Sequence, residues 1–168
     1  MELNAPEQGL RALTLHTAWS WLMAKGIKRI ENRSWAPPAW LYGYDFALHA
    51  GLHEDPKARE LATKFNIPIP ERVPRGSIVA VVRLVSMIKY EPLTRSISAS
   101  RPVSLYSGYA SPPLPSDEQK ERWFFGPCGW LVDEVRELPE PVAVRGFQGL
   151  WNIPASQLAE VKRQLSQG

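Results

Sequence analysis

Residues 26–35 read Gly26-Ile27-Lys28-Arg29-Ile30-Glu31-Asn32-Arg33-Ser34-Trp35. Gly26 is placed to end a preceding helix in a left-handed conformation. Alternation along the strand that follows puts Glu31, Arg33 and Trp35 on one side. Lys28 has the opposite parity, so it joins that side only if it lies in the turn before the strand begins. A solvated surface strand rarely needs this mixture of charges and an indole, whereas a pocket for a flat, anionic ligand does.

The residues before this stretch predict a strand followed by a helix. Residues 12–15 are mostly apolar and form a short buried strand. Thr17 is expected to cap a helix over residues 18–25, because its hydroxyl can accept a hydrogen bond from an amide of the first turn. Residues 1–11 are predicted to be a loose tail.

The rest of the chain predicts short strands that do not alternate regularly with helices. Asp55-Pro56 marks a helix start, since an acidic N-cap is followed by proline at the first helical position. The apolar run within residues 76–87 is typical of a central strand, or of a strand that curls around a barrel. Further strands are expected over residues 44–48, 129–135, 137–144 and 149–153. A last helix is expected from about residue 154. About six strands with two to three helices predict an α+β fold, a small mixed β barrel, rather than a doubly wound sheet.

Residues 88–122 form the one long segment without a sustained period. They include seven serines and five prolines. A structureless stretch of this length inside a compact domain is either disordered or a functional lid. The side chains in it that can stack on or pair with a ligand are Tyr90, Arg95, Arg101, Tyr106 and Tyr109. We therefore expect a single domain over residues 12–168 that carries this segment as a loop insertion.

Composition and charge indicate a soluble domain with a basic region. The chain has 168 residues, of which 44% are apolar and 22% are charged, with a net charge of +3. Between residues 11 and 33, five cations face one acid, which suits a phosphate-bearing partner, although a solvated basic face has the same charges. The single cysteine, Cys128, excludes an internal disulfide. Because no signal peptide or membrane span is apparent, we expect a cytoplasmic protein without a membrane partner.

The charged residues of the opening stretch are candidates for binding and catalysis. Lys28 and Arg33 can hold phosphate, and the neighbouring Arg29 belongs to the same basic run. Glu31 lies between these cations, which favour its carboxylate form. It can accept a hydrogen bond from an exocyclic amine or act as a base on a ribose 2′-hydroxyl. The alternative is a structural ion network that locks the helix to the strand.

Aromatic residues and histidines add to this candidate site. Trp35 can stack on a base, which is worth about 1–3 kcal/mol, or it can be a core residue. His49 can line the cleft or be satisfied at a strand end. We interpret Trp19, Trp21, Trp130 and Trp151 as mainly structural and leave Trp123 undecided. His49 and His53 have no cysteine or third histidine near them in sequence, so no metal site is expected, and no cofactor motif is present.

The chain resembles the ASCH family (activating signal cointegrator homology). The residues that carry the resemblance are Leu15–Leu22 and then the pattern Gly26-x-Lys28-x-x-Glu31-x-Arg33-Ser34-Trp35. Similar blocks follow at Leu48-His49-Ala50, Gly76–Ala80, Phe125–Trp130 and Gly149–Trp151. The similarity spans roughly residues 13–153 and leaves residues 88–122 without a counterpart.

The resemblance implies a PUA-like fold, which is a pseudobarrel of five or six strands with helices filling its openings. It also implies a cleft beside the first helix where the motif residues gather, and binding of RNA or another nucleic acid. A few relatives are ribonucleases, and some small members hydrolyse acetylated cytidine with a threonine nucleophile. Glu31 occupies that threonine position here, and a carboxylate cannot replace the hydroxyl. Ala18 stands where members often have proline, at slight cost to the helix.

We expect a module that binds RNA, single-stranded nucleic acid or a modified nucleoside. The expected ligand-binding residues are Lys28, Arg29, Glu31, Arg33, Trp35 and His49. One alternative is a metal-independent hydrolase, a ribonuclease or a deacylase of modified nucleosides, with Glu31 as base and Lys28 as electrostatic stabiliser. Another is an accessory domain of transcription or RNA processing that binds a protein through residues 88–122. The sequence leaves the oligomeric state open.

Overall fold

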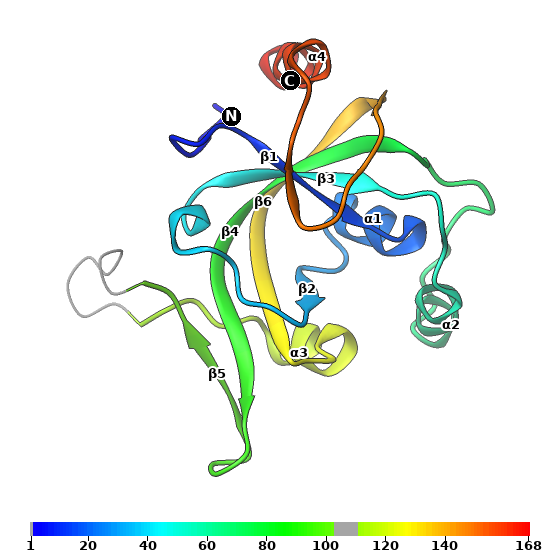
Figure 1. Ribbon diagram of the computed structural model, residues 1–168. Helices are drawn as coiled ribbons and strands as arrows, with labels where there is room; N and C mark the ends of the chain where they lie inside the picture. The colour runs from blue at the N-terminus through cyan, green and yellow to red at the C-terminus, as the bar shows by residue number, and fades with distance from the viewer. Residues whose placement is uncertain (1, 103–110) are drawn as a thin grey trace.

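The computed structural model describes residues 2–102 and 111–168, which contain seven strands and four helices (Figure 1). The strands are β1 (Arg11–Leu15), β2 (Ile30–Arg33), β3 (Asp45–Ala50), β4 (Ser77–Glu91), β5 (Ser96–Ser100), β6 (Cys128–Ala143) and β7 (Leu150–Asn152). The helices are α1 (Thr17–Ala24), α2 (Pro56–Lys64), α3 (Asp117–Trp123) and α4 (Ala155–Gln167), with a 3-10 turn at Ala39–Leu41. The candidate residues Tyr106 and Tyr109 lie outside the described residues.

All seven strands belong to one mixed sheet. The order is β2-β6-β4-β3-β1-β7, and β5 pairs with β4 beside this path. The pairing of β1 with β3 is parallel, whereas the other pairings are antiparallel. In Figure 1 the long strands β4 and β6 curve side by side, so that the sheet wraps around without closing. The predicted α+β, PUA-like pseudobarrel is therefore confirmed, with one strand and at least one helix more than expected.

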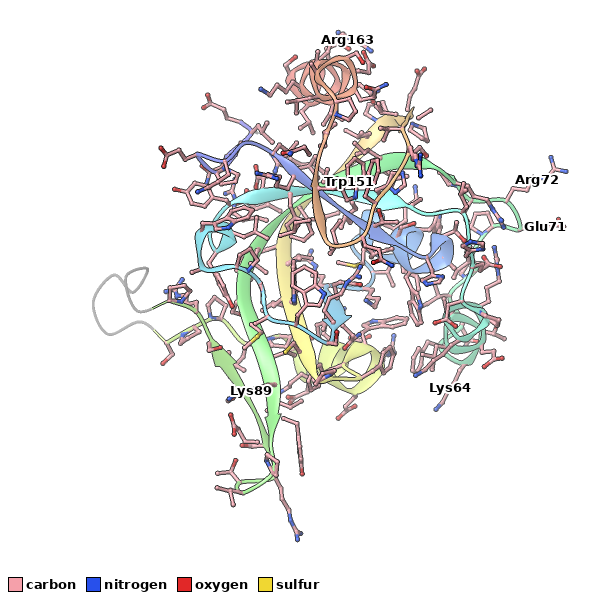
Figure 2. The ribbon with its side chains drawn as sticks, in the orientation of Figure 1. Lys64, Glu71, Arg72, Lys89, Trp151 and Arg163 are labelled. Atoms are coloured by element: carbon pink, nitrogen blue, oxygen red, sulfur yellow. The ribbon has the colours of Figure 1, made fainter. Side chains whose placement is uncertain are left out.

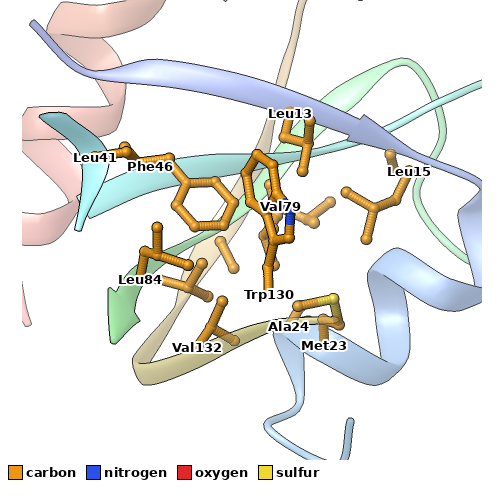
Figure 3. Close-up of a cluster of buried hydrophobic side chains, with 14 of the residues drawn as sticks. Leu13, Leu15, Met23, Ala24, Leu41, Phe46, Val79, Leu84, Trp130 and Val132 are labelled. Carbon is orange, nitrogen blue, oxygen red and sulfur yellow. The ribbon is translucent and has the colours of Figure 1, made fainter. Parts of the chain in front are cut away.

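The main hydrophobic core lies on the inner side of the curved sheet, between the strands and α1 (Figure 3). Trp130 of β6 is fully buried, and its ring lies edge-on to Phe46 of β3 with 6.0 Å between centroids. Met23 and Ala24 bring the end of α1 into this core. Burying large aromatic and aliphatic side chains is the main stabilising contribution in a domain of this size. It fixes α1, and hence the motif after it, against the barrel.

The prediction that residues 88–122 form one continuous loop without regular structure is wrong. Strand β4 continues to Glu91 and returns as β5, and this hairpin extends away from the rest of the molecule in Figure 1. The same segment ends in α3, whose first turn is capped by Ser116. The sequence shows no apolar periodicity for α3, because it is a short helix of mostly charged residues in which only Trp123 is buried.

Three further boundaries differ from the prediction. The chain before β1 is packed and not loose, because Leu10 is buried and the Asn4 amide donates to Asp45 Oδ2 at 2.6 Å. Thr17 is the first residue of α1 and not its cap, and its buried hydroxyl has no hydrogen-bond partner. The two strands expected over residues 129–144 are the single strand β6, which contains Glu134 at a φ of 46°. None of the described helices is long and apolar enough to cross a membrane.

Candidate functional site

A tight turn between α1 and β2 brings the charged motif residues together. Gly26 has a φ of 69°, and the amides of Ile27 and Lys28 both donate to the Leu22 carbonyl, at 3.0 and 3.1 Å. Lys28 therefore lies in the turn before β2 and reaches the side of the strand that carries Glu31 and Arg33. The structure thus meets the condition under which Lys28 joins the side of Glu31.

The carboxylate of Glu31 lies between two cations. Its Oε2 is 3.2 Å from Lys28 Nζ, and its Oε1 is 3.1 Å from Arg33 Nε. Lys28 is only 2% exposed and also donates to the Ile30 carbonyl. Burial lowers the pKa of Lys28, and the attraction of Glu31 opposes this in part. The arrangement is a buried ion pair extended by Arg33, whose Nη2 donates to the Thr14 carbonyl at 2.7 Å.

This ion pair lies at an open cavity of about 310 Å³, which we call the motif cleft. Its lining includes Lys28, Glu31, Arg33, Trp19, Lys57 and Phe125, together with the start of α1 at His16 and the cap of α2 at Asp55. The rings of Trp19 and Phe125 form an aromatic wall, with centroids 5.9 Å apart. The cleft thus combines charged groups with flat apolar faces, and its volume lies near the lower end of small-molecule sites.

The starts of two helices meet at the motif cleft. Asp55 caps α2 by accepting from the Lys57 amide at 3.0 Å, and its other oxygen accepts from Trp19 Nε1 at 3.0 Å. The hydrogen bond from Trp19 lowers the pKa of Asp55, so that it remains a carboxylate at neutral pH. Lys57 Nζ lies 4.1 Å from the centroid of the Phe125 ring. Helix starts and three cations favour an anionic group here, while two carboxylates can accept from N–H and O–H donors.

Three of the predicted binding residues gather at the motif cleft, and three lie elsewhere. Lys28, Glu31 and Arg33 line it. Arg29 does not line the motif cleft, and its Nη1 pairs with Asp133 Oδ1 at 2.6 Å. Trp35 and His49 line a second cavity of about 1010 Å³.

Trp35 is held partly by the core. Its ring lies edge-on to Trp130 at 4.8 Å, and its carbonyl accepts from Trp130 Nε1 at 3.1 Å. Trp35 also lines the second cavity. Trp35 is therefore a core residue that also borders a cavity, and its stacking on a base stays a prediction.

Both ring nitrogens of His49 are already hydrogen-bonded. Nε2 lies 2.8 Å from the Val144 carbonyl, which can only accept, so the proton belongs on Nε2. Nδ1 then accepts from the Thr14 hydroxyl at 3.2 Å, and that hydroxyl accepts from Trp151 Nε1 at 3.0 Å. Burial lowers the pKa of His49, which keeps the ring neutral. His49 therefore fastens β3 to the chain after β6.

Sequence reasoning missed Asp55, Lys57 and Phe125 as residues of the motif cleft and assigned Trp19 a mainly structural role. Asp55-Pro56 was correctly predicted as a helix start, but a cap residue does not reveal what lies opposite the helix start. Phe125 belongs to the Phe125–Trp130 block and reaches the cleft only through the packing of α3 and β6. Among residues 2–102 and 111–168, there is no group of three or more His, Cys, Asp or Glu side chains that could hold a metal ion.

A family model described as the ASCH domain matches residues 13–126. This range contains all the residues that line the motif cleft. A comparison with curated proteins gave no match.

Proposed function

Because the chain belongs to the ASCH domain family, a PUA-like family generally linked to RNA binding, we propose that the motif cleft binds a nucleotide of single-stranded RNA. The nucleotide enters with its base unstacked from its neighbours. Single-stranded RNA is recognised in general by bases that are splayed out, stacked on aromatic side chains and hydrogen-bonded along their edges.

The observation that carries this proposal is the buried Lys28–Glu31 pair at an open cleft. Burying an ammonium and a carboxylate costs free energy that their attraction seldom exceeds by much, so such a pair is weak evidence for a stabilising role. Glu31 is shared between Lys28 and Arg33 and borders the cavity. This supports a role in ligand binding.

Each wall of the motif cleft suits a part of a nucleotide. Arg33 and Lys57 supply positive charge for a phosphate, and the arginine can bind two of its oxygens at once. Trp19 and Phe125 supply flat faces for a base. Glu31 and Asp55 can accept hydrogen bonds from an exocyclic amine or a ribose hydroxyl.

The test is the affinity of charge-removing variants for RNA. Fluorescence anisotropy with a labelled single-stranded RNA 10-mer of randomised sequence should show that Arg33→Gln and Lys57→Gln each weaken binding at least fivefold. Lys162→Gln is the matched control, because it removes the same charge from the exposed face of α4 and should change the affinity less than twofold. Equal effects of all three substitutions would reduce the interaction to non-specific attraction by net charge and would contradict the proposal.

A second candidate function, cleavage of the bound RNA, is favoured by the contact between Glu31 and Lys28. In this reaction Glu31 accepts the proton of a ribose 2′-hydroxyl, and the oxygen attacks the adjacent phosphorus. The 5′-oxygen of the next nucleotide leaves with a proton from solvent, and a 2′,3′-cyclic phosphate is formed. The ammonium of Lys28 stabilises the charge that develops on the phosphate oxygens.

Incubation with the same RNA 10-mer separates binding from cleavage. If the chain is a ribonuclease, cyclic-phosphate products accumulate with the wild type and not with Glu31→Gln, which keeps the shape of the side chain. A DNA 10-mer should bind without being cut, because it lacks the 2′-hydroxyl. Cleavage that survives both Glu31→Gln and Lys28→Ala would come from another site or a contaminant.

A further inference from the structure

The motif cleft and the second cavity meet at Arg33 and Thr14, which line both. We name the second one the β6–β7 cavity, because residues 143–149, which connect β6 to β7, form one of its walls. Resting on the proposed function, we propose that the protein binds two consecutive nucleotides of one RNA strand. The first occupies the motif cleft, the second occupies the β6–β7 cavity, and Arg33 holds the phosphate that links them.

The charge of the β6–β7 cavity differs from that of the motif cleft. Among the described residues that line it are Arg33, Arg145 and His53, and none of the described lining residues is acidic. The motif cleft, in contrast, contains Glu31 and Asp55. A cavity with cations and no carboxylate suits the phosphodiester backbone, which is recognised mainly by its negative charge.

An exposed aromatic ring supplies a stacking face in the β6–β7 cavity. Phe147 is 52% exposed although it is a large apolar residue. Its ring lies 5.7 Å from that of Trp151, nearly edge-on, and the Arg145 guanidinium lies 5.4 Å from its centroid. Figure 2 shows Trp151 where β7 lies beside β1, close to the sheet. Bases stack on exposed aromatic rings with little regard to sequence, and a neighbouring arginine adds to the attraction.

The wall that carries Phe147 is held in place before any ligand arrives. The Val144 amide donates to the Gly76 carbonyl at 3.0 Å, and the Val144 carbonyl accepts from His49. Gly146 packs so closely that a Cβ atom there would lie 2.4 Å from His49 Cε1. This position therefore requires glycine. A wall fixed in this way loses little conformational entropy on binding, which favours affinity.

Arg33 is suited to the phosphate between the two cavities. One terminal nitrogen, Nη2, holds the Thr14 carbonyl, and Nε lies against Glu31 in an ion pair without hydrogen-bond alignment. A guanidinium has five N–H donors, so these contacts leave donors for a ligand. The side chain is 23% exposed. Arg33 thus borders two cavities that differ in charge, because only the motif cleft is lined by carboxylates among the described residues.

Competition against the labelled RNA 10-mer tests this inference. The competitors are a mixture of the four nucleoside 5′-monophosphates and a mixture of dinucleoside monophosphates, in which one phosphate joins two nucleosides. For the wild type we expect the dinucleotides to compete at least tenfold better than the mononucleotides. Phe147→Ala should remove this advantage and leave competition by mononucleotides unchanged. Phe147→Tyr, which keeps the ring, should retain it.

Tyr44→Ala is the control, because Tyr44 is also a partly exposed aromatic residue, at 36%, and lines neither cavity. It should leave both affinities unchanged, and if Phe147→Ala does not fold, Arg145→Gln should show the same selective loss. Equal competition by mononucleotides and dinucleotides, or no effect of Phe147→Ala, overturns the two-nucleotide site and leaves the proposed function standing. Absence of any binding to the 10-mer overturns both.

Discussion

At the scale of the residue, the ion network of Lys28, Glu31 and Arg33 has two interpretations with opposite energetic consequences. As a structural lock it would stabilise the fold, and its removal would be costly. As a binding site, the network lowers the stability of the free protein, and the interaction with the ligand offsets this cost. The sequence predicted that these side chains converge, because strand parity and the turn at Gly26 follow from local rules. It could not predict whether they would be buried.

The double variant Lys28→Met/Glu31→Gln distinguishes the two interpretations. It replaces the buried pair by neutral side chains of similar size, so we expect the free energy of unfolding in urea to be unchanged or raised by about 1 kcal/mol. RNA affinity should fall at least tenfold. A loss of stability greater than about 2 kcal/mol would instead assign the network a structural role.

His49 predicts how stability depends on pH. Its pKa is lower in the folded protein than the ordinary value of 6.5, chiefly because of burial. The unfolded chain therefore binds more protons below pH 6.5, and the free energy of unfolding decreases as the pH falls through the folded-state pKa. Urea unfolding between about pH 7.5 and pH 5 should show this decline. His49→Gln should flatten the profile in that window, whatever its absolute stability, and an unchanged slope would exclude His49 as the cause.

At the scale of the element, α3 supports the turn that carries the motif. Gln119 accepts from the Arg29 amide at 2.8 Å and donates to the Ile27 carbonyl at 2.7 Å. These bonds hold the backbone on both sides of Lys28. No local pattern indicates this contact, because it joins residues about ninety positions apart and α3 lies in the segment predicted to be a loop. A deletion of all of residues 88–122 would therefore disturb the motif as well as any partner surface.

Gln119→Ala should weaken RNA binding without removing any group from the motif cleft. Two hydrogen bonds to backbone groups are lost, so we expect a decrease of about 1–3 kcal/mol in the free energy of unfolding and a fall of several-fold in affinity. Gln157→Ala, at a half-buried position in the first turn of α4 that lines neither cavity, is the matched control and should change neither quantity appreciably. Anisotropy and urea unfolding measure the two effects. Unchanged affinity in Gln119→Ala would show that the turn holds its shape without α3.

At the scale of the whole molecule, predictions that depend on a local sequence pattern succeeded, whereas the order of the strands in the sheet was not predicted. Elements with a strong local pattern, such as the central strand β4 and the proline-started helix α2, were predicted from the sequence. The pairings of β2 with β6 and of β1 with β7 were not predicted, because they join distant parts of the chain. The composition of the site was not predicted either, because Trp35 and His49 line the β6–β7 cavity whereas Lys28 lines the motif cleft. Residues of one motif are thus divided between two cavities.

The two cavities together predict the salt dependence of RNA binding. Arg33, Lys57 and Arg145 are the exposed or half-exposed cations that line them. Neutralising about three phosphates of a single strand gives a slope of about −2 in a plot of log affinity against log salt concentration. Arg33→Gln should make this slope shallower by about 0.7. A slope near zero for the wild type would mean that phosphate contacts contribute little.

The pairing of β2 with β6 also determines when, during synthesis, the motif strand can gain its neighbour. The motif residues are made before the strand that pairs with them, because β2 gains its neighbour only when residues 128–131 have been made. β1 gains its β7 neighbour only with residues 150–152. A nascent chain that ends at residue 126 carries every side chain of the motif cleft but neither of those strands. The sheet around the motif can therefore be completed only after residues 128–131 and 150–152 have been made.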